Sequence, residues 1–166
     1  DRFHEGYTAV HYEQALAARA ALSRLNAAPP LALYVHLPFC ESVCYYCACN
    51  KVVTRHHERA AEYLDALERE IALHECALGV RQRVTQLHFG GGTPTFMSDA
   101  ELSRLMAAIG LAFELAPNAE CSIEVDPRTA TPLRLQHLAA LGFNRISFGV
   151  QDFDPELPQA VHRMQP

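Results

Sequence analysis

The sequence contains neither a long apolar run nor a block of basic residues, and each absence excludes a class of protein. No segment approaches the roughly 18 consecutive apolar residues of a transmembrane helix, so we expect no membrane span. The formal net charge is −5 and the basic residues do not cluster, which leaves nucleic-acid binding without an electrostatic basis. The first residues show neither an initiator methionine nor the pattern of a signal peptide, and we expect both ends of the chain to be cut.

The six cysteines are distributed in a way that argues against a disulfide framework. Four of them fall within ten positions, whereas the other two stand far away, at Cys76 and Cys121. Disulfide scaffolds are usually small and loop-rich, but this chain has 166 residues and can bury a real core. We therefore interpret the four clustered thiols as metal ligands, which implies a reducing cytoplasm.

Apolar patterns predict strands that alternate with helices. Strands are expected at 31–37, 83–89, 120–125 and 144–150. Helices are expected at 11–25, 58–78, from 98 to about 113, and at 132–141. Ser98 and Glu101 have the spacing of a capping box, and Gly142 suits a helix C-terminus. The resulting β-α-β-α-β-α-β order predicts an α/β fold with a parallel sheet.

Each distinctive run of residues follows or ends one of these strands. The cysteine loop follows the first strand and "GGGTPT" follows the second, while "EVDPR" and "GVQDF" stand at the ends of the third and fourth. Ligands gather at the carboxyl ends of parallel strands, both in barrels and in open sheets. The four runs therefore predict one functional site at that edge of the sheet.

The cysteine loop has a spacing suited to an iron–sulfur cluster. Cys40, Cys44 and Cys47 form C-x3-C-x2-C, and Cys49 adds a trailing C-x-C. A cluster of four irons normally takes four thiolates, so three ligands would leave one iron open to a small molecule with an amine and a carboxylate. The alternative is a structural zinc site that uses all four thiols, although such sites usually pair two separated C-x2-C knuckles.

These motifs resemble those of the radical S-adenosylmethionine (AdoMet) superfamily. The thiol spacing directly after a first strand is typical of that superfamily, and "HFGGGTPT" is similar to its glycine-rich AdoMet motif. Glycine in such a motif lets the backbone approach a ligand closely. Residues 33–55, with "SIEVDPR", "GFNRISFGVQDF" and "VHRMQP", narrow the resemblance to the oxygen-independent coproporphyrinogen III oxidase family. The resemblance extends from about Tyr7 to the last residue.

The resemblance implies an architecture and a division of the chain. The family has a (β/α)6 partial TIM-type barrel followed by a C-terminal helical domain. We expect residues 1–30 to form an N-terminal helical extension and residues 31–166 to form the first part of the barrel. On this reading the chain is truncated, and the C-terminal part of the barrel and the helical domain are absent.

The resemblance also implies a set of site residues. The ligands of a [4Fe-4S] cluster fall on Cys40, Cys44 and Cys47, and Cys49 matches an extra cysteine needed for activity. The first of two AdoMet molecules, which chelates the open iron, matches Tyr34, Gly91 and Glu124. The second matches Tyr46, Ala48, Gly92, Thr93, Gln151 and Arg163. Ala48 replaces the usual glycine, and its added methyl matters where φ is positive or where a ligand packs closely.

The activity that the resemblance implies is the oxidative decarboxylation of two propionates of coproporphyrinogen III to vinyl groups, which gives protoporphyrinogen IX in haem synthesis. The reduced cluster cleaves AdoMet to methionine and a 5′-deoxyadenosyl radical, which takes a hydrogen from the propionate β-carbon. The implied partners are the substrate and an electron-donor protein for the cluster, with no nucleic acid and no membrane, and the implied protein is a cytoplasmic monomer. The alternative is a haem-binding chaperone of the same superfamily. Those relatives typically carry Asp-Phe after the last motif thiol, where this chain has "CACN".

Other residues are weaker candidates. His36 and His88 stand near strand ends, where a histidine either is a hydrogen-bonded core residue or lines the cavity. Asp126 and Arg128 either form a local ion pair or face the pocket. Cys76 is expected to be a buried helix residue. Arginines for the substrate carboxylates are not distinguished by the sequence, and the candidates are Arg55, Arg128, Arg145 and Arg163.

Overall fold

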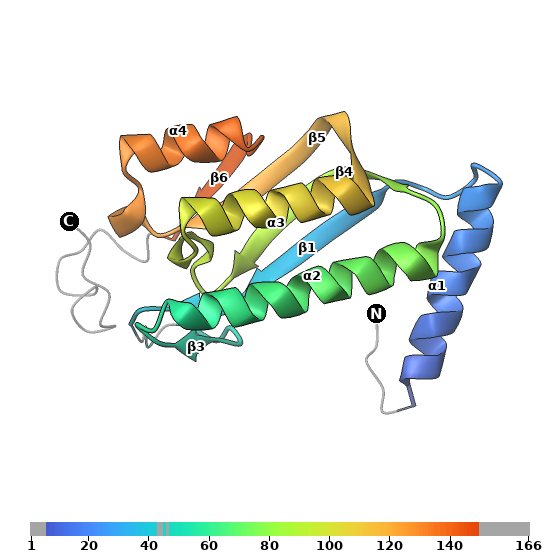
Figure 1. Cartoon of the computed structure of the whole chain (residues 1–166), viewed down its shortest axis with the longest axis horizontal. Coiled ribbons are helices and arrows are strands. Elements are labelled where there is room, and N and C mark those ends of the chain that lie inside the picture. The colour runs from blue at the N-terminus through green and yellow to red at the C-terminus, as the bar shows by residue number, and fades with distance from the viewer. Residues whose placement is uncertain (1–5, 43–44, 46, 150–166) are drawn as a thin grey trace.

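The structure is a computed structural model that describes residues 6–42, 45 and 47–149. Its main elements are α1 (Ala9–Arg24), β1 (Leu31–Leu37), α2 (Glu58–Leu78), β4 (Gln82–Gly91), α3 (Asp99–Ala112), β5 (Phe113–Val125), α4 (Pro132–Ala140) and β6 (Arg145–Phe148). The four long strands form one sheet in the order β1-β4-β5-β6, and every neighbouring pair is parallel (Figure 1). The expected α/β alternation and the parallel sheet are confirmed.

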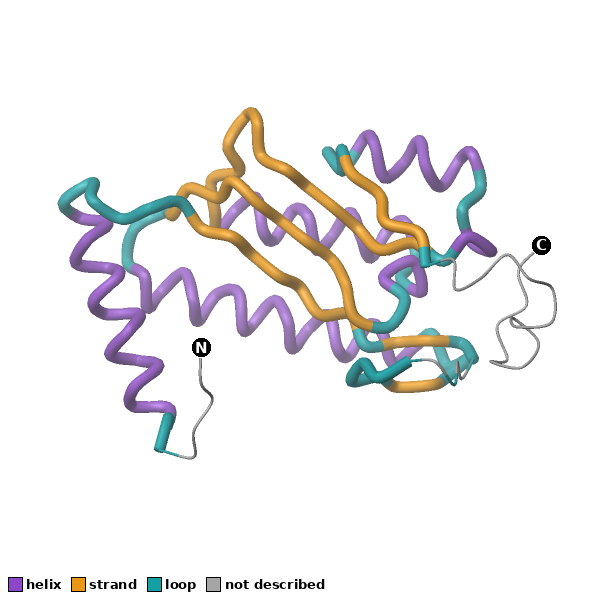
Figure 2. The backbone as a smooth tube through the Cα atoms, turned by 180° about the vertical axis from the view of Figure 1, so that it is seen from behind, coloured by secondary structure: helices purple, strands orange, loops and turns teal. Residues whose placement is uncertain are grey.

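The two faces of the sheet differ in cover and in composition. Helices α2 and α3 run along one face, whereas no helix of the described residues lies on the other face (Figure 2). The covered face holds the core, in which the largest fully buried side chains include Leu64, Leu87, Phe89, Leu102 and Ile123. Burial of this apolar area provides the main driving force for folding. The uncovered face carries polar side chains from all four strands, among them Tyr34, His88, Ser122 and Arg145.

Local signals set the ends of the helices that position the strands. The capping box at α3 is confirmed, because the Ser98 amide donates to Glu101 Oε2 at 2.8 Å and the Glu101 amide donates to Ser98 Oγ at 3.3 Å. Gly142 lies one residue beyond the C-cap of α4 with φ of 98°. Gly79 ends α2 in the left-handed region with φ of 68°. That conformation suits glycine, which has no Cβ to oppose it.

Two expectations were wrong in detail, and one short pair of strands was not expected. The third strand begins at Phe113 and not at residue 120, because Phe113 already pairs with Gln82 before the register shifts further along the strand. The cysteine loop also contains a short parallel pair, β2 (Phe39–Cys40) with β3 (Val52–Val53), which is too short to leave a periodic pattern. Cys76 is exposed and not buried.

Two further elements are single turns of 3-10 helix at the carboxyl ends of the central strands. They are η1 (Pro94–Phe96) after β4 and η2 (Pro127–Thr129) after β5. Within the described ranges, no helix has both the length and the apolar character needed to cross a bilayer.

Candidate functional site

The candidate site lies where the cysteine loop meets the glycine-rich run after β4. β2 and β3 close the base of the cysteine loop. The Val52 amide donates to the Pro38 carbonyl at 2.8 Å, and the Thr54 amide donates to the Cys40 carbonyl at 2.9 Å. The base of the loop is therefore held by backbone hydrogen bonds.

The glycine-rich run is joined to the same segment, backbone to backbone. The Gly92 amide donates to the Leu37 carbonyl at 2.9 Å, and the Thr93 amide donates to the Phe39 carbonyl at 2.8 Å. A Cβ at Gly92 would lie 2.6 Å from the carbonyl oxygen of Pro38 and 2.7 Å from that of Phe39, distances that real side chains essentially never show. Only glycine permits this approach, which brings the two motifs together.

Gly91 lines the second cavity described below, and its missing side chain also leaves space on the opposite side. Its φ of 118° lies in the region that favours glycine, and a Cβ there would meet the His36 ring at 2.8 Å and the Leu37 carbonyl at 3.0 Å. The missing side chain thus leaves room for β1. The amide of Gly91 donates to Glu124 Oε2 at 3.1 Å.

The thiols of Cys40 and Cys47 line one cavity of about 260 Å³, together with Lys51 and Thr93. The Thr93 hydroxyl donates to Cys40 Sγ at 3.7 Å. Burial acts to raise the pKa of the Cys47 thiol, but hydrogen bonds with Cys49 and the positive charge of Lys51 outweigh it, so that this pKa is lowered. A lowered pKa favours the thiolate, which is the form that binds metal.

Cys49 differs from its neighbour. It is exposed, and its pKa is raised, first by the hydrogen bond with the Cys47 thiol and then by burial and the nearby negative charges of Cys47 and Glu124. Of the two thiols, Cys47 therefore has the lower pKa and forms the thiolate more readily than Cys49.

A second cavity of about 360 Å³ adjoins the first and shares Cys47 with it. The sequence-predicted site residues that line it are Ala48, Cys49, Gly91, Gly92, Thr93 and Glu124. Strands β5 and β6 complete the wall with Val125, Ser147 and Phe148. Within the described part of the chain, Asn26 is the only non-glycine residue with positive φ, so Ala48 causes no left-handed strain.

Glu124 and Tyr34 face each other across the uncovered face of the sheet. His88 Nε2 lies 3.5 Å from Glu124 Oε1, and the Tyr34 ring stacks on the His88 ring with centroids 5.7 Å apart. Burial raises the pKa of Tyr34, with a further contribution from the negative charges of Glu124 and Cys49. The side chains matched to the first AdoMet are thus electrostatic neighbours.

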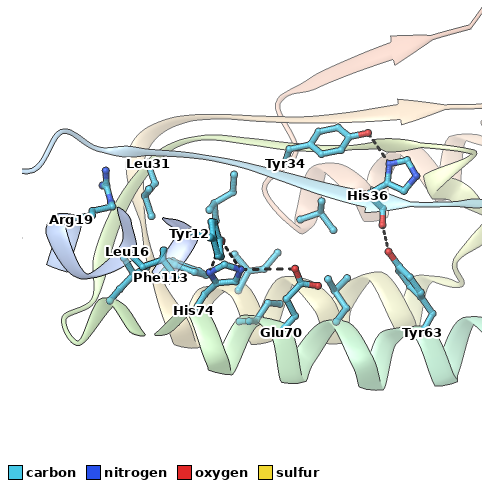
Figure 3. Close-up of a pocket in the computed structure, with 16 residues that line it drawn as sticks. Tyr12, Leu16, Arg19, Leu31, Tyr34, His36, Tyr63, Glu70, His74 and Phe113 are labelled. Atoms are coloured by element: carbon cyan, nitrogen blue, oxygen red, sulfur yellow. Dashed lines mark hydrogen bonds and ion pairs between the residues drawn. The ribbon is translucent and has the colours of Figure 1, made fainter. Parts of the chain in front are cut away.

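His36 connects this group to the cysteine loop. Its Nδ1 lies 3.1 Å from the Tyr34 hydroxyl, and its Nε2 lies 2.9 Å from the Asn50 carbonyl. The Tyr63 hydroxyl donates to the His36 carbonyl at 2.6 Å, and Figure 3 shows Tyr34 and Tyr63 reaching His36 from β1 and α2. Both histidines are thus hydrogen-bonded members of one polar cluster, and the residues that line the two site cavities include neither of them.

Asp126 and Arg128 form the local ion pair that was one expectation for them, and they also face the pocket, which was the other. Arg128 Nη2 lies 2.5 Å from Asp126 Oδ2, and the Arg128 amide donates to Asp126 Oδ1 at 2.9 Å. The same two residues line the cavity that contains Cys40 and Cys47. The ion pair therefore shapes the turn after β5 and forms part of the site wall.

Sequence reasoning missed two contributions to the site. Lys51 was not singled out, although a cation four residues after a motif cysteine is a signal for a stabilised thiolate, and its ammonium donates to the Cys47 carbonyl at 2.8 Å. Phe96 was also missed. Its ring stacks on His57 at 4.2 Å and on Phe39 at 5.2 Å, which packs η1 against the cysteine loop.

Four predicted site residues lie outside the described part of the chain: Cys44, Tyr46, Gln151 and Arg163. Among the residues that are described, no three His, Cys, Asp or Glu side chains come together as a metal site. The two described motif thiols nevertheless fit an iron–sulfur cluster. They share a cavity, they are soft sulfur donors, and the cation beside Cys47 favours its ionised form.

A separate cavity of about 330 Å³ lies between α1, α2 and the outer edge of β1. Its lining includes Leu16, Leu33 and Ile71, and the Tyr12 hydroxyl lies 3.4 Å from the His74 ring nitrogens (Figure 3). Tyr34 and His36 also border it, so β1 separates this cavity from the site.

Comparisons with known proteins agree with this geometry. The model of the radical SAM superfamily matches residues 34–166. The chain is 48% identical over 160 residues to oxygen-independent coproporphyrinogen III oxidase of Escherichia coli strain K12, an alignment that covers 95% of this chain and 35% of that protein. It is 53% identical over 136 residues to the same enzyme of Salmonella typhimurium, covering 82% of this chain and 30% of the relative.

A solved structure is also similar. Coproporphyrinogen III oxidase from Escherichia coli, described as a radical SAM enzyme, matches with a TM-score of 0.88 at 45% identity. The match covers 99% of this chain and 36% of that one, so this chain spans about a third of the length of these relatives. The expected fold, the first part of a radical-AdoMet barrel, is confirmed.

Proposed function

This chain belongs to the radical SAM superfamily, and on that premise we propose that it provides the cluster-binding and AdoMet-binding part of an oxygen-independent coproporphyrinogen III oxidase. The observation that carries the proposal is the pair of adjoining cavities that share Cys47. One of them holds the motif thiols Cys40 and Cys47, and the other gathers the glycine-rich run and Glu124. Membership of the superfamily implies a [4Fe-4S] cluster and AdoMet as cofactors.

We assign the cluster ligands to Cys40, Cys44 and Cys47. Hydrogen bonds with Cys49 and the charge of Lys51 lower the pKa of the Cys47 thiol, and the Thr93 hydroxyl donates to Cys40 Sγ, which supports both thiols as iron ligands. Cys49, whose pKa is raised, lines the neighbouring cavity.

We assign the first AdoMet to Tyr34, Gly91 and Glu124. The Glu124 carboxylate can accept from an ammonium or from ribose hydroxyls, and it borders the cavity beside Cys47. We assign the second AdoMet to Tyr46, Ala48, Gly92, Thr93, Gln151 and Arg163, of which Ala48, Gly92 and Thr93 line the same cavity. When bound, the cluster and AdoMet supply one-electron chemistry that removes hydrogen from an unactivated carbon. The protein positions the reacting groups and keeps water away from them.

We propose coproporphyrinogen III as the substrate, because the curated relatives act on it by name. Conversion of each propionate to a vinyl group would release CO2, a hydrogen atom and one electron; the hydrogen atom would pass to the AdoMet-derived radical and the electron to an external acceptor. We further propose an electron-donor protein for the cluster, a monomeric state and a cytoplasmic setting in which the thiols stay reduced. In this assignment residues 1–30 are an extension, and residues 31–166 begin the barrel.

The experiment uses the complete protein that carries this chain, reconstituted with iron and sulfide without oxygen. We expect AdoMet-dependent release of CO2 from coproporphyrinogen III together with a divinyl product. Stoichiometric haem binding without that product would favour the alternative, a haem-binding chaperone.

Cysteine variants test the ligand assignment. Serine at Cys40, Cys44 or Cys47 should remove the cluster iron, whereas Cys49→Ser should retain it. Cys76→Ser is the matched control, since Cys76 is exposed on α2. If Cys49→Ser loses its iron while one of the other three retains it, the assignment is wrong.

A further inference from the structure

The uncovered face of the sheet holds a histidine to which the proposed function gives no role. His88 lies on the central strand β4, where its cross-strand neighbours are Tyr34 of β1 and Ser122 of β5. The His88 side chain contacts the other two on one face of the sheet, opposite to the buried Leu87 and Phe89. His88 is 35% exposed, whereas Ser122 beneath it is buried.

Ser122 fixes the orientation of the His88 ring. Ser122 Oγ lies 2.7 Å from His88 Nδ1, and the Ser122 hydroxyl also reaches the Leu87 carbonyl at 3.4 Å. With Nδ1 held on this side, the other ring nitrogen, Nε2, faces Glu124 and lies 3.5 Å from its Oε1.

Gly90 explains how three bulky groups converge at this point. A Cβ at Gly90 would lie 2.9 Å from His88 Nε2, 3.1 Å from the Tyr34 ring and 3.2 Å from the Glu124 carboxyl carbon. The backbone of Gly90 does not have a positive φ, so its conformation alone does not require glycine. The missing side chain leaves the space that the three groups occupy.

Glu124 consequently has a neighbour at each of its oxygens. The Gly91 amide donates to Oε2 at 3.1 Å, and His88 faces Oε1 from the other side. A carboxylate fixed in this way loses less rotational freedom when a ligand binds, which strengthens binding. We propose that His88 is a positioning residue, which orients the Glu124 carboxylate for the cationic or hydroxyl-bearing end of AdoMet. This inference rests on the proposed function.

The test measures the dissociation constant of AdoMet for the reconstituted complete protein, with the AdoMet-induced change in the electron paramagnetic resonance spectrum of the reduced cluster as a second readout. His88→Leu should bind AdoMet about fivefold more weakly, the loss typical of one partly exposed ion-pair contact. His88→Gln keeps an N–H that can face the carboxylate and should stay within about twofold of wild type. His74→Leu is the matched control and should bind normally, because His74 also faces a glutamate, Glu70, at 3.9 Å, but on α2.

A double-mutant cycle with Glu124→Gln separates positioning from packing. If His88 acts through Glu124, the effect of His88→Leu should largely disappear in the Glu124→Gln background. The proposal is overturned if His88→Leu binds AdoMet as wild type does, if leucine and glutamine weaken binding equally, or if the effect of leucine persists without Glu124. A wild-type protein that holds iron but does not bind AdoMet would instead refute the proposed function.

Gly90→Ala keeps the inference testable if His88→Leu fails to hold iron. It crowds the same three side chains without altering any of them and should also weaken AdoMet binding. Normal affinity in iron-loaded Gly90→Ala would overturn the proposal in that case. If neither His88→Leu nor Gly90→Ala holds iron, His88 is needed for folding and not for positioning Glu124, and the proposal is overturned as well.

Discussion

Replacing Gly92 with alanine should destabilise the protein through backbone contact alone. The new methyl carbon would lie 2.6 Å from the Pro38 carbonyl oxygen, below the 3.0 Å under which Cβ contacts essentially do not occur. The obstacle is backbone, which cannot rotate away as a flexible side chain can. The glycine-rich run must therefore move off the cysteine loop.

The magnitude follows from the hydrogen bonds that such a movement stretches. The Gly92 amide would lose the Leu37 carbonyl, and the Thr93 amide would lose the Phe39 carbonyl. A buried backbone group left unpaired costs about 1–3 kcal/mol. We expect Gly92→Ala to lower the free energy of unfolding by about 2–4 kcal/mol, and to weaken iron binding because Thr93 moves away from Cys40.

Gly110→Ala is the matched control. Gly110 lies in α3, and a Cβ there meets no heavy atom within 4 Å. Alanine should raise the free energy of unfolding by up to about 1 kcal/mol, because glycine is a poor helix former. Urea unfolding of the iron-free proteins, followed by circular dichroism, compares the two variants without a contribution from metal binding. If Gly92→Ala and Gly110→Ala shift the midpoint equally, contact between the two motifs is not what makes Gly92 necessary.

Three further outcomes follow from the structure. Ser98→Ala should cost about 1 kcal/mol of unfolding free energy, because it removes the capping bond to the Glu101 amide; unfolding at unchanged urea concentration would contradict this. Cys76 should react rapidly with a maleimide in the native protein while Cys121 stays protected, because Cys121 is buried and burial raises its pKa; mass spectrometry that finds both modified at similar rates would refute the assignment. Gly91→Ala should lose stability and cluster iron together, because its Cβ would meet β1 and not the ligand cavity; full iron content with weakened AdoMet binding alone would show the opposite.

The sequence predicted the parts of the fold that depend on local pattern. The strand at 31–37 and the helix at 58–78 have the predicted bounds, because each combines an apolar periodicity with a clear stop such as Gly79. The first residues of β5, from Phe113 onward, show no apolar periodicity that marks them as a strand. Its pairing with Gln82 is a contact between distant residues, which periodicity does not encode.

In the candidate site, too, local patterns were predictable and contacts between distant residues were not. Spacing and resemblance named the thiols and the glycine-rich run, and strand order brought them to one edge of the sheet. The sequence could not predict which atoms of neighbouring strands meet. A side chain at Gly91 would collide with His36, and the His88 ring turns Nε2 toward Glu124 because Nδ1 contacts Ser122 on the next strand. Such contacts depend on the three-dimensional packing of two elements, which a sequence pattern does not encode.

The closed base of the cysteine loop has a consequence for the order of assembly. Where a metal is the main cross-link of a small domain, the chain stays unfolded until the metal arrives. Here the ends of the loop are joined by the bonds from Val52 to Pro38 and from Thr54 to Cys40, and the sheet behind them has its own apolar core. These bonds and the core therefore offset the entropy lost on closing the loop without a contribution from iron. We expect maturation to proceed from a folded apoprotein into which iron and sulfide are delivered late, and iron-free protein with native circular dichroism would demonstrate that sequence of events.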